Sequence, residues 1–434
     1  MLFKTLKIIL ESNYLSILLI TILLLSPAFI TSFLRLFVPE KFESVFFGIF
    51  IFAYLYFIKN NKNIYFILAL LSGNIALYYK EVAFIMLGSF AFFNFIFSFR
   101  ISNLKQKLLD LSLMLSSLMW IIIYYVIIIL NKTTSGSYGD TPYNKLIVFI
   151  KNVMNYILIE PFLIIGVFGI LAYRIYLITF RDNKINPFLD SALLASFLHI
   201  LSYFILNIYS FHYLLPTYIF AIFPLGYYFR SYFRVIFIKI IFIISLILYL
   251  LNSIPAFLYQ LNHYKAVPNN FQESIAFLDN YLKNNPNTTI YLEGVNRASN
   301  IEVYHSFIKN LEFLGHNNFD MKSDIGIDNE ILGKENKDCK YSVFKSNAII
   351  PKSSGDLVIL TPYTSKPFKE NNNYEKIFEA TNGFNLPLLG IKSLIKLALS
   401  KIIKDNNEIV LSNNIYSLPI HFSIYRVKDS GGYN

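Results

Sequence analysis

The stretch "ALYYKEVAFIML", residues 76–87, places Lys80 and Glu81 side by side between two apolar runs. Charged side chains among apolar segments cost free energy, so such a pair marks a junction between helices or a functional site. The runs on either side, about 64–79 and 82–98, have the composition of helices that cross a membrane. The fold therefore depends on how many runs of this kind the chain contains.

Apolar runs continue through the first 260 of the 434 residues. The chain is 55% hydrophobic and has a mean hydropathy of +0.49, above the range of ordinary soluble proteins. Crossing a bilayer takes roughly 20 apolar residues in a helix. We expect about nine transmembrane helices, at about 14–37, 44–58, 64–79, 82–98, 109–130, 156–179, 188–209, 213–229 and 235–258. The sequence thus predicts a polytopic α-helical membrane protein over residues 1–260.

The charges predict the orientation of these helices. Residues 1–260 hold 19 Lys and Arg against 9 Asp and Glu. With the N-terminus in the cytoplasm, 13 of the 19 basic residues fall in inner loops and 6 in outer loops, as the positive-inside rule requires. Basic residues in short loops between apolar runs are typical of an integral protein of the bacterial inner or plasma membrane. They argue against a nucleic-acid partner.

An odd number of crossings places the polar residues 265–434 outside the cytoplasm. Strand patterns at 288–294, 355–360 and 421–428, with helix starts at "NFQE" 270–273 and "SNIE" 299–302, predict a soluble α/β domain with a mainly parallel sheet. No Gly-rich phosphate motif follows these strands, so no nucleotide site is expected. A basic amphipathic helix at 388–404 fits the membrane surface and the sheet equally well. The single cysteine, Cys339, excludes an intrachain disulfide.

The unusual polar residues of the membrane half gather at the predicted outer face. Glu40 and Glu43 are three residues apart and share a helical face, where they can bind a divalent cation, act as acid and base, or simply be solvated. Lys80 suits a phosphate group, and Glu81 suits a base, a metal or a neighbouring lysine. The alternative is an interfacial charge pair that marks a turn.

Three further candidates have weaker signals. His212, which is followed by Tyr213, lies at a predicted outer helix start and is either a ligand or a hydrogen-bonded structural residue. Asp140 lies in the Gly- and Ser-rich outer loop "NKTTSGSYGDTPYNK", which begins at Asn131. An amphipathic stretch up to Glu160 follows it, and the two are predicted to be a mobile loop with a surface helix that acts as a lid. Glu160, before Pro161, gives the weakest signal of the three.

The order of the segments resembles a known superfamily. "SPAFITSFLRLFVPEKFESVFFGIFIFAYLYF", "LALLSGNIALYYKEVAF" and "HYLLPTYIFAIFPLGYYF", followed by an outer α/β domain, resemble the GT-C polytopic glycosyltransferases over about residues 15–260. This superfamily includes protein O-mannosyltransferases and the aminoarabinose transferases of lipid A. The first helix here resembles the third of the family. The resemblance thus implies that two helices, and the first outer loop with the family's principal catalytic acid, are missing from this chain.

The resemblance implies an activity and roles for the candidate residues. It implies transfer of a sugar from a polyprenyl-phosphate donor to a lipid, glycan or protein acceptor on the extracytoplasmic face. Glu40, Glu43 and Glu81 are then the catalytic candidates, while Lys80, His212 and Tyr213 are candidates to bind the donor phosphate. A divalent cation is left open, because some members use one. The alternative is a non-catalytic accessory protein that binds a lipid phosphate and recruits a partner through its outer domain.

Overall fold

The computed structural model describes residues 1–35, 38–130, 145–206, 208, 210–230, 236–292, 297–323, 352–362, 373–383 and 421–428. Asp140 with its predicted lid, the predicted helix at 388–404 and Cys339 lie outside these ranges. The chain divides into two compact units, and the break along the chain falls between Phe257 and Leu258, where the composition changes from apolar to mixed.

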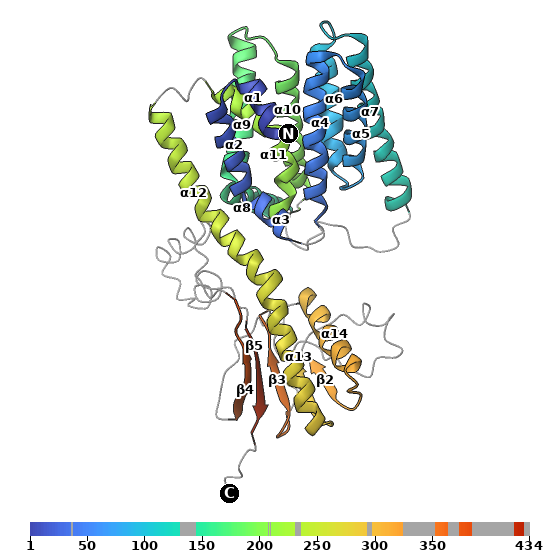
Figure 1. Cartoon of the computed structure of the whole chain (residues 1–434), viewed down its shortest axis with the longest axis vertical. Helices are drawn as coiled ribbons and strands as arrows, with labels where there is room; N and C mark the ends of the chain where they lie inside the picture. Colours follow the sequence, from blue (N-terminus) through green and yellow to red (C-terminus); the bar gives the residue numbers. More distant parts are fainter. Residues whose placement is uncertain are drawn as a thin grey trace. The chain divides into compact units, whose positions relative to one another are not determined.

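The first unit is helical (Figure 1). Its helices are α1 (Leu2–Leu10), α2 (Asn13–Leu25), α3 (Pro27–Leu34), α4 (Pro39–Asn60), α5 (Asn63–Leu77), α6 (Ala83–Ser98), α7 (Leu104–Tyr124), α8 (Lys145–Ile159), α9 (Pro161–Phe180), α10 (Pro187–Ile205), α11 (Leu215–Phe229) and most of α12 (Ile236–Leu261). A π-helical turn, η1 (Tyr125–Ile129), extends α7, and a 3-10 turn, η2 (Phe211–Leu214), precedes α11.

A helix lies at each of the nine predicted positions, but fewer meet the requirements of a membrane span. In the described residues, α4, α7 with the start of η1, α9 and α10 are long and apolar enough, and the bent pair α2 and α3 makes a fifth if it counts as one span. The protein is therefore a polytopic helical protein with four or five candidate spans. The predicted number of nine is not confirmed.

The structure adds one helix, α1, ahead of the first of the nine predicted positions. Helix α1 buries Thr5, Leu6 and Leu10, while Lys4 and Lys7 remain exposed. The apolar face of α1 packs with α2 on α11. At the contact, a Cβ on Gly226 would lie 2.5 Å from Leu19 Cδ1. A glycine is thus what allows α11 to approach the first two helices this closely.

The break between α2 and α3 occurs at Ser26 and Pro27. Pro27 has no N–H to donate within the preceding helix, and it stands at the first position of α3, where that loss carries no cost. The Ser26 hydroxyl caps α3 by accepting from the Phe29 N–H at 3.0 Å. The two helices are bent by 57° as a result.

The second unit holds a small sheet with two helices, α13 (Val267–Asn284) and α14 (Arg297–Phe313). A π-helical segment, Asn262–Ala266, leads into α13, so this helix starts before the predicted capping site at 270. Apolar residues of both helices and the sheet form the core, among them Leu278, Phe307 and Ile359.

The five strands of the second unit form a mixed sheet. They are β1 (Thr289–Leu292), β2 (Asp320–Ser323), β3 (Leu357–Leu360), β4 (Tyr374–Ala380) and β5 (Phe422–Val427), in the order β2-β1-β3-β5-β4. The pairs β1–β2 and β1–β3 are parallel, whereas β3–β5 and β4–β5 are antiparallel. The prediction of a mainly parallel sheet is therefore wrong for half of the pairs: β5, a predicted strand, runs antiparallel to β3, and β4, which was not predicted, runs antiparallel to β5.

Candidate functional site

Three separate segments bring Glu40, Lys80 and His212 together at one end of the first unit. Pro39 starts α4 and places Glu40 in its first turn, where the helix dipole favours a negative charge. Helix α5 ends at Leu77, and the turn before α6 carries Lys80, whose Nζ lies 3.2 Å from Glu40 Oε1. His212 in η2 approaches the same oxygen with Nε2 at 3.9 Å.

Lys80 is the more exposed member of its ion pair with Glu40. Its side chain is 21% exposed, while that of Glu40 is fully buried. The Nζ atom also lies 4.6 Å from the centre of the Tyr213 ring, within cation–π range. Burial alone would lower the pKa of Lys80, but Glu40 and Tyr213 outweigh it, so the pKa lies above its usual value. Lys80 is therefore positively charged near pH 7 and forms an ion pair with the buried carboxylate of Glu40.

His212 supplies a hydrogen-bonding ring rather than a charge. Burial, and secondarily the positive charges of Arg35 and Lys80, lower the pKa of His212 to about 3. The ring is thus neutral near pH 7, and its 3.9 Å approach to Glu40 is not an ion pair. Its Nδ1 shares a hydrogen bond of 2.8 Å with the Ser210 hydroxyl.

Glu43 lies one turn further along α4 and is completely buried. Neither of its carboxylate oxygens has a hydrogen-bond partner in the part of the chain that the structure describes, and the same holds for the Tyr203 hydroxyl on α10. The charges of Glu43 and Glu40 act on that hydroxyl. The Tyr203 ring stacks on the Tyr213 ring, with the ring centres 5.1 Å apart. Unpartnered polar atoms that gather in one buried place indicate water or a ligand.

The structure separates Glu81 from this buried cluster. Its side chain is exposed in the turn before α6. Its charge interacts electrostatically with Lys80 and Glu43. The described residues contain no group of three or more His, Cys, Asp or Glu side chains that could hold a metal ion, so Glu40, Glu43 and His212 do not form one. The predicted carboxylate role of Glu81 and the divalent cation remain predictions.

Tyr156 on α8 positions the segment that carries His212. Its hydroxyl donates to the Ile208 carbonyl at 3.0 Å and accepts from the Ser210 N–H at 3.3 Å. Ser210 in turn bonds to His212. A chain of hydrogen bonds therefore runs from α8 to the ring beside Glu40. Sequence reasoning missed Tyr156 because it looks like any other aromatic residue at the end of an apolar run.

Glu160, which gave only a weak sequence signal, is a fully buried junction residue between α8 and α9. Its carboxylate accepts from the Ala28 N–H at 2.7 Å, the Tyr218 hydroxyl at 2.6 Å and the Tyr249 hydroxyl at 2.5 Å. Ala28 lies directly after the break between α2 and α3. Three donors satisfy this carboxylate, so Glu160 holds the broken helix in place.

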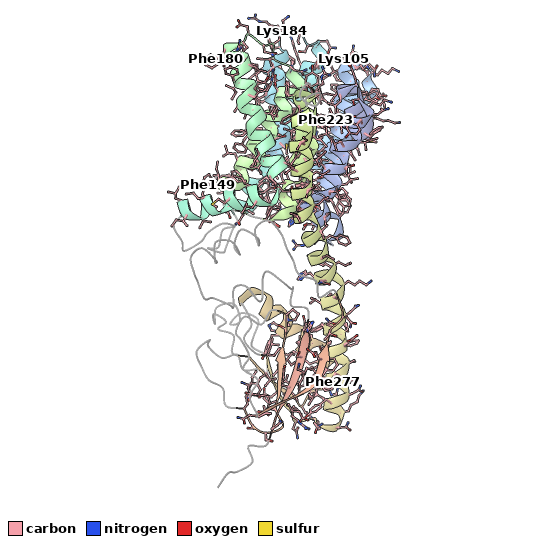
Figure 2. All side chains as sticks on the ribbon, turned by 90° about the vertical axis from the view of Figure 1, so that its left-hand side faces the viewer. Lys105, Phe149, Phe180, Lys184, Phe223 and Phe277 are labelled. Carbon is pink, nitrogen blue, oxygen red and sulfur yellow. The ribbon has the colours of Figure 1, made fainter. Side chains whose placement is uncertain are left out.

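The opposite end of the unit, where Figure 2 shows Lys105 and Lys184, has its own buried polar groups. Arg174 on α9 makes two hydrogen bonds to Asp190 on α10, at 2.9 and 2.8 Å. The Tyr228 hydroxyl of α11 donates to Asp190 at 2.6 Å. Arg174 is one of the 13 basic residues that the positive-inside count assigns to inner loops, but it is only 4% exposed, and through Asp190 it forms a clamp between α9, α10 and α11.

A second hydrogen-bonded network lies among α4, α6 and α7. The Tyr54 hydroxyl donates to Asp110 at 2.5 Å, and Asn94 donates to Asp110 at 2.9 Å and to the Tyr54 oxygen at 2.6 Å. No sequence signal marked these residues, because each is a single polar group in an apolar run. The three side chains bond to one another and leave only Asn94 Oδ1 without a partner among the described residues, whereas neither carboxylate oxygen of Glu43 has one.

Comparison with protein-family models, with curated proteins and with solved structures finds no match to this chain.

Proposed function

We propose that the chain is a membrane glycosyltransferase that moves a sugar from a polyprenyl-phosphate donor to an acceptor hydroxyl at the Glu40 cluster. The observation that carries the proposal is that two buried carboxylates lie in the first two turns of a candidate span and that one of them, Glu40, pairs with the partly exposed Lys80. Buried ionisable groups in membrane helices are expensive to maintain, so their presence favours a function. The order of the segments resembles that of the GT-C superfamily, which supports the proposal of a glycosyltransferase.

The roles follow from the partners of each group. The carboxylate oxygens of both Glu40 and Glu43 lack a hydrogen-bond donor among the described residues, but only Glu40 has an ion-pair partner there, so we assign Glu43 to accept the proton of an acceptor hydroxyl. Glu40 is committed to Lys80, and it holds that ammonium group at the exposed side of the cluster. Lys80 is therefore the group that faces a phosphate, and neutral His212 offers a hydrogen bond beside it.

These groups account for the proton, the bond formed and the bond broken in the transfer step. The acceptor hydroxyl gives its proton to Glu43, and its oxygen forms a bond to the anomeric carbon of the sugar. The bond between that carbon and the phosphate oxygen breaks, and the electron pair leaves with polyprenyl phosphate. Lys80 stabilises the charge that develops on the leaving phosphate.

The test is transfer from a fluorescent polyprenyl-phosphate sugar in membranes that contain the full chain, with released polyprenyl phosphate as the readout. A positioned general base contributes about 10²- to 10⁴-fold, so Glu43→Gln should lower the rate by at least about 100-fold. Glu11→Gln, an exposed glutamate at the end of α1, is the matched control and should leave the rate unchanged. Full activity in a Glu40→Gln, Glu43→Gln double variant would place the chemistry elsewhere.

One observation favours the accessory function as a second candidate. Both carboxylates are closed off while Lys80 is partly exposed, which suits binding of a lipid phosphate without turnover. In that case Lys80→Ala lowers the binding of polyprenyl phosphate, whereas Glu43→Gln leaves binding intact and no transfer is seen in any variant. The two functions are thus separated by measuring binding and transfer on the same membranes.

A further inference from the structure

Helix α8 has an unusual distribution of polar and apolar side chains. Ile147, Ile150 and Met154 share one face and are 63%, 49% and 57% exposed. On the opposite face, Asn152 and Asn155 are buried at 7% and 9% exposure. A helix that faces water shows the reverse pattern, with polar residues outside.

The depth of α8 relative to the candidate spans follows from its contacts. Its last residue, Ile159, is followed by Glu160 and then by Pro161, where the candidate span α9 begins. Phe149 and Tyr156, two turns apart on α8, both contact Phe204, which lies at the end of the candidate span α10. In Figure 2, α8 with Phe149 runs across the direction of the spanning helices. Helix α8 therefore lies at the level where two spans end.

We propose that α8 is an interfacial helix whose Ile147, Ile150 and Met154 face contacts the lipid of the bilayer. Its level at the span ends places it at the boundary between headgroups and acyl chains, where an exposed apolar face is favourable. The buried side of the same helix carries Tyr156, which holds Ser210 and through it His212. The lipid surface thus supports the element that positions one wall of the Glu40 cluster. This inference is independent of the proposed enzymatic activity.

The single tryptophan of the chain, Trp120, allows a direct test. In a Trp120→Phe background, Ile150→Trp is reconstituted as the full chain into vesicles of lipids brominated either near the headgroup or near the end of the acyl chain. Two control positions are Ala172→Trp, exposed half-way along α9, and Phe313→Trp on α14, which is 91% exposed in the second unit.

The expected result is strongest quenching of Ile150→Trp by bromine near the headgroup, of Ala172→Trp by bromine deep in the acyl region, and none of Phe313→Trp. Absence of quenching at position 150 would show that water or another protein segment covers this face, and would overturn the proposal. Strongest quenching at 150 by the deep bromine would overturn the interfacial depth. Neither result depends on whether the chain transfers sugars.

Discussion

At the scale of single residues, the ion pair of Lys80 and Glu40 is the feature whose energetics are easiest to state. Glu40 is completely buried, so it depends on Lys80 for compensation of its charge. Removing one partner of such a pair costs more than removing both, because the remaining charge stays buried without a counter-charge.

We therefore expect Lys80→Ala to lower the free energy of unfolding by about 1–3 kcal/mol, measured by thermal unfolding in detergent. The double variant Lys80→Ala, Glu40→Gln should recover part of this loss. Lys59→Ala, an exposed lysine at the other end of α4, is the control and should change little. A double variant as unstable as Lys80→Ala would show that Lys80 stabilises the fold by packing on Tyr213.

The candidate site was predictable where a charge interrupts an apolar run. Glu40, Lys80 and His212 were nominated because they lie at helix ends, and the structure brings these three together. The partners could not be predicted, because they come from segments distant in sequence. Tyr203 lies inside a run and is one of 32 tyrosines, so its unpartnered hydroxyl has no sequence signal.

At the scale of elements, the position of a helix was easier to predict than its limits. Apolar runs located the helices, but α1 was missed because its nine residues are fewer than a periodicity window needs, and the break at Ser26 was missed because apolar residues continue on both sides of it. Strands β2 and β4 were missed because "DMKS" and "YEKIFEA" carry charges instead of an apolar pattern. The polar half was therefore predicted less well than the membrane half.

The packing of α11 on α1 and α2 gives a prediction with an internal control. Gly226→Ala would place a Cβ 2.5 Å from Leu19 and 3.2 Å from Leu10. Overpacking costs about 1–3 kcal/mol, and the helix preference of alanine returns only about 1 kcal/mol. We expect Gly226→Ala to unfold below the wild type in detergent melts.

The control for this substitution is Gly169→Ala on α9. A Cβ at Gly169 would meet nothing within 4 Å, so only the gain in helix preference remains and the midpoint should stay equal or rise. Equal midpoints for the two glycine variants would indicate that α11 can move away from α2 without cost.

At the scale of the whole molecule, the orientation in the membrane is the largest open prediction. The positive-inside count predicts that the end with Lys105 and Lys184 faces the cytoplasm and that the Glu40 cluster faces outward. With Cys339→Ser as background, Glu81→Cys should react with an impermeant maleimide on intact cells. Lys105→Cys should react only after the cells are opened. The reverse pattern would exclude an extracytoplasmic donor site.

The clamp between Arg174 and Asp190 has a consequence for how the protein is made. Only residues 181–186 separate α9 from α10, so the arginine and the aspartate can meet as soon as both segments have left the ribosome. Inserted alone, each of the two segments would carry an unpaired charge into the membrane, which is unfavourable. We therefore expect α9 and α10 to enter the bilayer together as one hairpin in which the two charges are already paired.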